Sequence, residues 1–75
     1  YEEAPTLNLL GEVSRELGKW EAAEVFHREA LEVYHAFKVT RFNSITYFRL
    51  GVIASHFKRW SDAEDCFKKA LEQST

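Results

Sequence analysis

The stretch that decides the fold is LGEVSRELGKWEAAEVFHREALE at residues 10–32, because it returns as LGVIASHFKRWSDAEDCFKKALE at residues 50–72. The matched residues share an offset of 40 positions, and they are Leu10-Gly11 with Leu50-Gly51, Trp20 with Trp60, Ala23 with Ala63, and Ala30 with Ala70. Self-similarity at a fixed offset across amphipathic segments is typical of a helical repeat protein. The sequence therefore predicts two copies of one helical unit.

Apolar residues at three- and four-residue spacing extend the prediction to the whole chain. They predict helices from about Pro5 to Leu17, from about Glu21 to Phe37, from Asn43 or Ser44 to Phe57, and from Asp62 to about Glu72. No segment shows the alternation or the turn dipeptides of β-strands and hairpins. We therefore expect an all-α chain of four helices.

Local signals mark where these helices begin and end. Gly18 is suited to a C-cap. Ser61, followed three residues later by Glu64, fits a capping box and predicts that Ser61 is the N-cap of the fourth helix. Residues 38–43 contain neither Pro nor Gly, so we expect a short and partly helical connection.

Gly11 and Gly51 fall in the middle of predicted helices, where Gly costs about 1 kcal/mol relative to Ala. A cost repeated at the same place in both copies indicates close packing. We predict that the paired helix approaches each glycine near Ala23 and Ala63.

Composition limits the class of protein. The 75 residues make a single domain, residues 1–75, with a net charge of -2. This charge does not provide a basic surface for nucleic acid, and no apolar run is long enough to cross a membrane. Cys66 is the only cysteine, so no internal disulfide can form, and we expect a cytoplasmic or other reducing intracellular compartment.

These residues resemble the tetratricopeptide repeat. The first copy has Leu7, Leu10-Gly11 and Ser14 followed by Ala23, His27 and Ala30, and the second has Tyr47, Leu50-Gly51 and Ala54 followed by Ala63, Phe67 and Ala70. The resemblance places repeat one at about residues 4–37 and repeat two at about residues 44–73. It implies two antiparallel helix-turn-helix hairpins stacked as a short right-handed α-solenoid. The offset of 40 exceeds the usual repeat of about 34 residues, and the extra residues lie between Glu32 and Asn43.

The resemblance also implies a binding role, in which the first helix of each repeat lines a concave groove. The expected partner-binding residues lie opposite the core stripe of these helices, and they are Asn8, Glu12, Arg15, Ile45, Phe48, Arg49, Val52, Ser55 and His56. The residues expected to pack the repeats are Leu10, Gly11, Trp20, Ala23, Ala30, Leu50, Gly51, Trp60, Ala63, Phe67 and Ala70. Some relatives hold a terminal carboxylate with Lys and Asn, but Glu12 would repel that group.

The apolar side chains of Ile45, Phe48 and Val52 lie where a solvent-facing surface would be polar, which indicates an interface. Either a ligand or a further repeat can fill it. Trp20 and Trp60 open the second helix of each hairpin, and their repetition favours a structural role over ligand stacking.

The sequence contains no pattern that predicts catalysis. His27, His35 and His56 are too dispersed for a metal site, and glycine-rich phosphate loops are absent. We therefore expect a non-enzymatic protein–protein interaction module without a cofactor or metal, which binds a peptide or helix of a partner protein. The alternative is self-assembly into a homodimer through exposed repeat faces or an exchanged hairpin.

Overall fold

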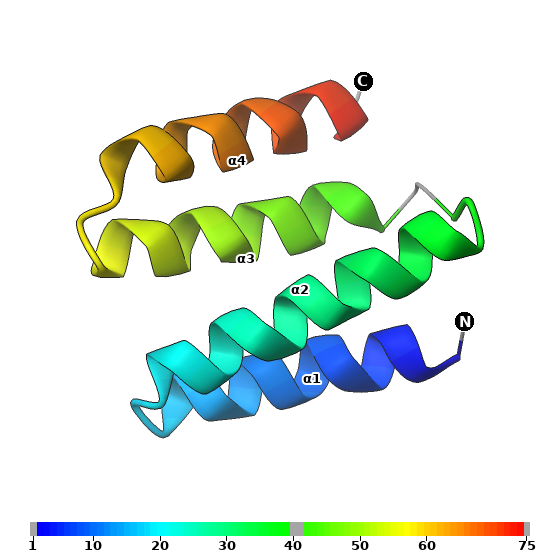
Figure 1. The fold of residues 1–75 in the computed structure, drawn as a ribbon, viewed down its shortest axis with the longest axis horizontal. Helices are drawn as coiled ribbons and strands as arrows, with labels where there is room; N and C mark the ends of the chain where they lie inside the picture. The colour runs from blue at the N-terminus through cyan, green and yellow to red at the C-terminus, as the bar shows by residue number, and fades with distance from the viewer. Residues whose placement is uncertain (1, 40–41, 75) are drawn as a thin grey trace.

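The computed structural model describes residues 2–39 and 42–74, and it contains four α-helices in this part of the chain (Figure 1). They are α1 (Glu3–Glu16), α2 (Trp20–Ala36), α3 (Asn43–His56) and α4 (Trp60–Ser74). Helices α1 and α2 form one antiparallel hairpin, and α3 and α4 form the second. The all-α prediction is confirmed.

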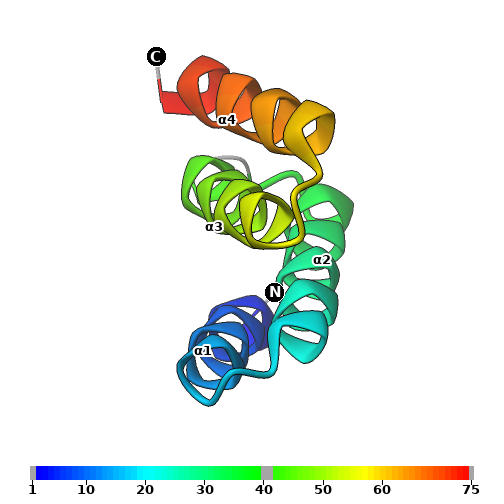
Figure 2. The same cartoon turned by 90° about the vertical axis from the view of Figure 1, so that its left-hand side faces the viewer.

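The two hairpins stack through the α2–α3 contact, as Figure 2 shows with α3 between α4 and the α1–α2 pair. Ala4, Ala30 and Tyr34 form a buried core cluster at one end of the first hairpin, with Leu7, Val33, Val39 and Phe42 packed against it. Phe42 directly precedes α3, so this cluster also fixes the second hairpin on the first.

Three helices end in the same hydrogen-bonded turn. At the end of α1, the Gly18 N–H donates to the Arg15 carbonyl and the Lys19 N–H donates to the Ser14 carbonyl. This pair of bonds is a Schellman motif, which needs a residue with positive φ. Gly18 has a φ of 78°, and Lys38 and Lys58 adopt 56° and 61° at the ends of α2 and α3. The C-cap residue of α1 is Leu17, and Gly18 follows it as the residue with positive φ that ends the helix, a place that lysine takes in the other two turns.

The predicted N-cap at Ser61 is wrong. Helix α4 begins at Trp60, and its first turn is already closed by the Ala63 N–H donating to the Arg59 carbonyl at 2.9 Å. The Schellman turn around Lys58 sets the chain direction before Ser61 is reached. The same occurs at Lys19 and Trp20, so the turn rather than the side-chain cap determines where the second helix of each hairpin begins.

The connection between the hairpins, residues 37–42, shows turns at residues 37, 38 and 42 and no helix at its described residues 37–39 and 42. Thr40 and Arg41, which the prediction of a partly helical connection included, lie outside the described residues. Helix α2 has 17 residues, whereas α1 has 14.

The two mid-helix glycines are packed against aromatic rings of the paired helix, which belong to the residues one turn after Ala23 and Ala63. A Cβ added at Gly11 would lie 2.6 Å from the His27 Nε2 atom, and one added at Gly51 would lie 2.7 Å from the Phe67 Cε1 atom. Both distances are shorter than real Cβ contacts. The glycines therefore make room for an aromatic side chain of the partner helix in each hairpin.

Leu10 and Trp60, two of the residues expected to pack the repeats, are exposed in the described chain. Leu10 is 42% exposed, whereas its counterpart Leu50 is 6% exposed. Leu50 lies on α3, which is covered by α2, and no described helix covers the same face of α1. Trp60 is exposed for the corresponding reason, because no described helix packs on the outer face of α4.

Candidate functional site

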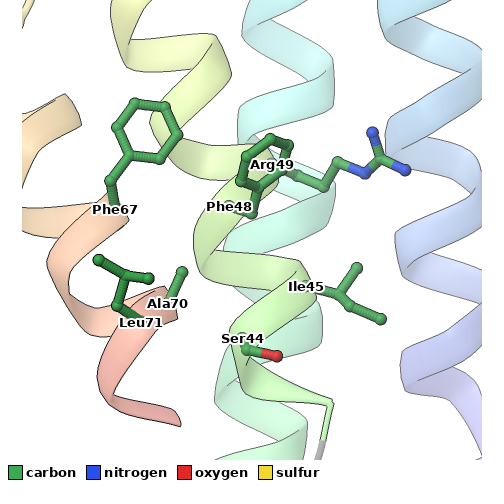
Figure 3. Close-up of a pocket in the computed structure, with 7 residues that line it drawn as sticks. All are labelled: Ser44, Ile45, Phe48, Arg49, Phe67, Ala70 and Leu71. Carbon is green, nitrogen blue, oxygen red and sulfur yellow. The ribbon is translucent and has the colours of Figure 1, made fainter. Parts of the chain in front are cut away.

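An apolar groove runs between α3 and α4. It has a volume of about 610 Å³ and is lined by Ser44, Ile45, Phe48, Arg49, Phe67, Ala70 and Leu71 (Figure 3). The rings of Phe48 and Phe67 contact each other across it, with centroids 5.6 Å apart. Leu71 and Ile45 are largely exposed at its edges. The groove can therefore hold an apolar side chain or helix face.

The Arg49 side chain extends from this groove away from α4 (Figure 3). Its Nε lies 3.1 Å from the Glu12 Oε1 atom of α1. Because this ion pair already neutralises the guanidinium, Arg49 limits the groove on one side and is not a free cation for a ligand. The groove itself thus favours apolar contact.

The equivalent groove in the first hairpin is partly covered by α3, while Leu9, the counterpart of Arg49, stays 63% exposed. Forty positions before Ser44, Phe67 and Ala70 are Ala4, His27 and Ala30, which are at most 1% exposed. Ser44, Phe67 and Ala70 are each half-buried. The place that α3 takes on the first hairpin is therefore open on the second.

A polar network joins α1, α2 and α3 on the first hairpin. The His27 Nδ1–H donates to the Asn8 Oδ1 atom at 2.9 Å, and the Asn8 amide donates to the Thr46 hydroxyl at 3.3 Å. The Thr46 hydroxyl in turn donates to the Phe42 carbonyl at 3.3 Å. Thr46 is fully buried, so these bonds satisfy polar groups at the contact between hairpins.

Glu12 lies close to three basic side chains in the same region. Its carboxylate pairs with Arg49 and, at 3.3 Å, with Arg15, and its Oε1 atom lies 3.7 Å from the His27 Nε2 atom. Burial lowers the pKa of His27 below its ordinary value of 6.5, and Arg49 and Arg15 act in the same direction, whereas Glu12 opposes them. The folded protein therefore favours neutral His27.

Two further contacts hold the hairpins together. The Trp20 and His56 rings are stacked, with centroids 3.8 Å apart and an interplanar angle of 6°. The Arg59 guanidinium lies 3.0 Å from the Glu24 carboxylate. The structural role predicted for Trp20 thus consists of a contact with the neighbouring hairpin.

The predicted partner-binding residues separate into groups. Ile45, Phe48 and Arg49 line the groove, while Asn8, Glu12 and Arg15 belong to the polar network. Val52 and Ser55 are half-buried on α3, and His56 stacks on Trp20.

The groove also contains four residues that the prediction did not place there, namely Ser44, Phe67, Ala70 and Leu71. Phe67 and Ala70 carry the same pattern as the buried His27 and Ala30 and were therefore predicted to be packing residues. Periodicity marks the apolar face of α4 but does not show whether another helix covers it.

Among the described residues, no cluster of three or more His, Cys, Asp or Glu side chains could hold a metal ion. Within the same residues, no helix has the length and apolar character needed to cross a membrane. Cys66 is half-buried on α4, and burial raises the pKa of its thiol.

Comparison with known proteins agrees with the hairpin geometry. No curated protein and no solved structure matches the chain. A family model described as tetratricopeptide repeat matches residues 2–75, which is nearly the whole chain. Such repeats are generally non-catalytic scaffolds for protein–protein interaction. The chain therefore belongs to the tetratricopeptide repeat family.

Proposed function

We propose that this protein is an interaction module that binds an α-helix of a partner protein in the groove between α3 and α4. The observation that carries the proposal is the unequal filling of two equivalent grooves. On the first hairpin Ala4, His27 and Ala30 of the groove are covered, whereas on the second the groove is open and lined by apolar side chains. A surface that already accepts a helix on the first hairpin is suited to accept one on the second.

The chemistry of the groove supports an apolar helix as the ligand. Phe48, Phe67 and Leu71 supply ring and aliphatic surface. Helix-in-groove recognition inserts apolar residues spaced by three or four positions into such a surface. Buried aromatic anchors commonly contribute a large share of binding energy, which makes Phe48 the residue to test first.

The test compares capture of partner proteins by wild type, Phe48→Glu and Val25→Glu. Phe48 is 49% exposed in the groove, and Val25 is 52% exposed on α2 outside it, so Val25→Glu controls for placing a carboxylate on an exposed apolar position. Far-UV circular dichroism verifies that each variant keeps its helical content.

We expect Phe48→Glu to lose a protein that wild type and Val25→Glu both retain. The captured protein is then cut into helical segments, and one segment should reproduce the binding. Equal capture by Phe48→Glu and wild type would refute the assignment of the groove.

A further inference from the structure

The open groove has a counterpart on the opposite side of the same molecule, where α1 has an exposed apolar face. This face matches the side of α3 that is buried against the first hairpin. Val13 is 47% exposed, whereas its counterpart Ile53 is fully buried, and Leu10 differs from Leu50 in the same way. Seven of the ten exposed large apolar side chains among the described residues lie on these two surfaces, and they are Leu9, Leu10, Val13, Leu17, Ile45, Phe48 and Leu71.

We infer that the helix that fills the α3–α4 groove is α1 of a second copy of this chain, docked head to tail as α3 docks on the first hairpin. This inference rests on the proposed function, because α1 of the second copy would occupy the same groove. The known contact between the hairpins supplies the geometry, and a shift of 40 positions gives each residue pair of the new contact.

The first such pair replaces an ion pair with an apolar pair. Glu12 and Arg49 meet at 3.1 Å between the hairpins. Forty positions after Glu12 is Val52, and forty positions before Arg49 is Leu9. Both positions are charged in the contact between the hairpins and apolar in the contact between molecules, so the two faces remain complementary. An independent change of either would have placed a charge opposite an apolar side chain, which is unfavourable.

The second pair keeps its charges. Glu24 and Arg59 lie 3.0 Å apart between the hairpins, and their counterparts are Glu64 and Lys19. An acidic residue on the receiving hairpin again meets a basic residue on the docked one. The stack of Trp20 on His56 does not return as an aromatic pair, because Glu16 stands in place of His56.

The contact joins different surfaces of the two copies and leaves one open surface at each end. Such a heterologous arrangement continues beyond a dimer unless it closes into a ring. Sedimentation equilibrium of the 75-residue chain over an about hundredfold range of concentration should therefore show a mass that rises past that of a dimer.

Two variants block one face each. Leu9→Glu alters the docked face of α1, and Val52→Glu alters the residue of α3 that the shift of 40 positions places opposite Leu9. Each variant alone should associate at least about tenfold more weakly than wild type, because a carboxylate would face an apolar side chain. Mixed together, they retain one unaltered contact, so they should form a 1:1 heterodimer that does not grow. Circular dichroism shows that each variant is folded.

A double variant tests the register of the contact. Leu9→Arg with Val52→Glu in one chain copies the Arg49–Glu12 ion pair into the contact between molecules. We expect this chain to regain the concentration-dependent mass that Val52→Glu alone loses. If both variants fold and the double variant remains monomeric, the assigned register is wrong.

The second-copy assignment would be overturned by a wild-type chain that stays monomeric at every concentration, or by single variants that do not associate when mixed. Neither result removes the groove as a site for a different protein, because the capture by wild type and Phe48→Glu tests that separately. Conversely, self-association that is insensitive to Val52→Glu would overturn the inference even if partner capture depends on Phe48.

Discussion

Gly11 packs against the His27 ring, and this contact gives a quantitative prediction for Gly11→Ala. The added Cβ would lie 2.6, 2.7 and 2.9 Å from three ring atoms. His27 is 1% exposed and bonded to Asn8 at 2.9 Å, so the ring cannot move without losing that bond.

Three contributions set the size of the effect. Overpacking costs about 1–3 kcal/mol, and weakening a buried hydrogen bond costs about 1–3 kcal/mol. Replacing Gly by Ala inside a helix stabilises the folded protein by about 1 kcal/mol. The free energy of unfolding should therefore fall by about 3 kcal/mol, which lowers the thermal midpoint of a domain of this size by about 12–24 °C.

The assay is thermal and urea unfolding by circular dichroism in wild-type and His27→Ala backgrounds. Without the ring, only the helix propensity remains, so Gly11→Ala should stabilise the His27→Ala protein by about 1 kcal/mol. Gly51→Ala provides a comparison, because Phe67 is half-buried beside the groove and can turn aside, so its cost should be smaller. Equal losses from Gly11→Ala in both backgrounds would refute the packing argument.

Three further predictions concern single side chains. Lys58 has a φ of 61°, so Lys58→Gly should raise the free energy of unfolding by about 1 kcal/mol in the same assay, and no gain would contradict the strain assigned to this turn. Burial lowers the pKa of His27 below 6.5, so as the pH falls the unfolded chain binds a proton that the folded protein excludes. Stability should therefore fall between about pH 7.5 and pH 5.5, and His27→Phe should reduce that slope, whereas an unchanged slope would contradict the role of His27. Burial raises the pKa of the Cys66 thiol, so its reaction with a disulfide reagent near pH 8 should be slower in the folded protein than in urea, and equal rates would contradict this.

Much of the fold could be predicted from the sequence, because helix formation and hairpin packing depend on local patterns that occur twice. The offset of Leu10-Gly11 and Leu50-Gly51 was sufficient to predict two hairpins. The start of α4 was not predicted correctly, since the capping signal at Ser61 competes with the Schellman turn at Lys58, and lysine gives no sequence signal for positive φ.

The candidate site could be predicted only in part. Phe48 and Ile45 stand out because they are apolar on a face expected to be polar, and both line the groove. Phe67 and Leu71 could not be distinguished from core residues, because coverage by a neighbouring helix is a tertiary property. Asn8 has a position on the expected binding face, but its amide is bonded within the contact between hairpins.

The most direct test of the central claim, that the α3–α4 groove holds a helix, is photo-crosslinking from the groove. Benzoylphenylalanine is introduced in place of Phe48, or in place of Val25 as the control, and the adducts are mapped by mass spectrometry. The account predicts that position 48 crosslinks to one helical segment, either α1 of a second copy or a helix of a partner protein, and that position 25 does not. Adducts that are equally scattered from both positions would contradict it.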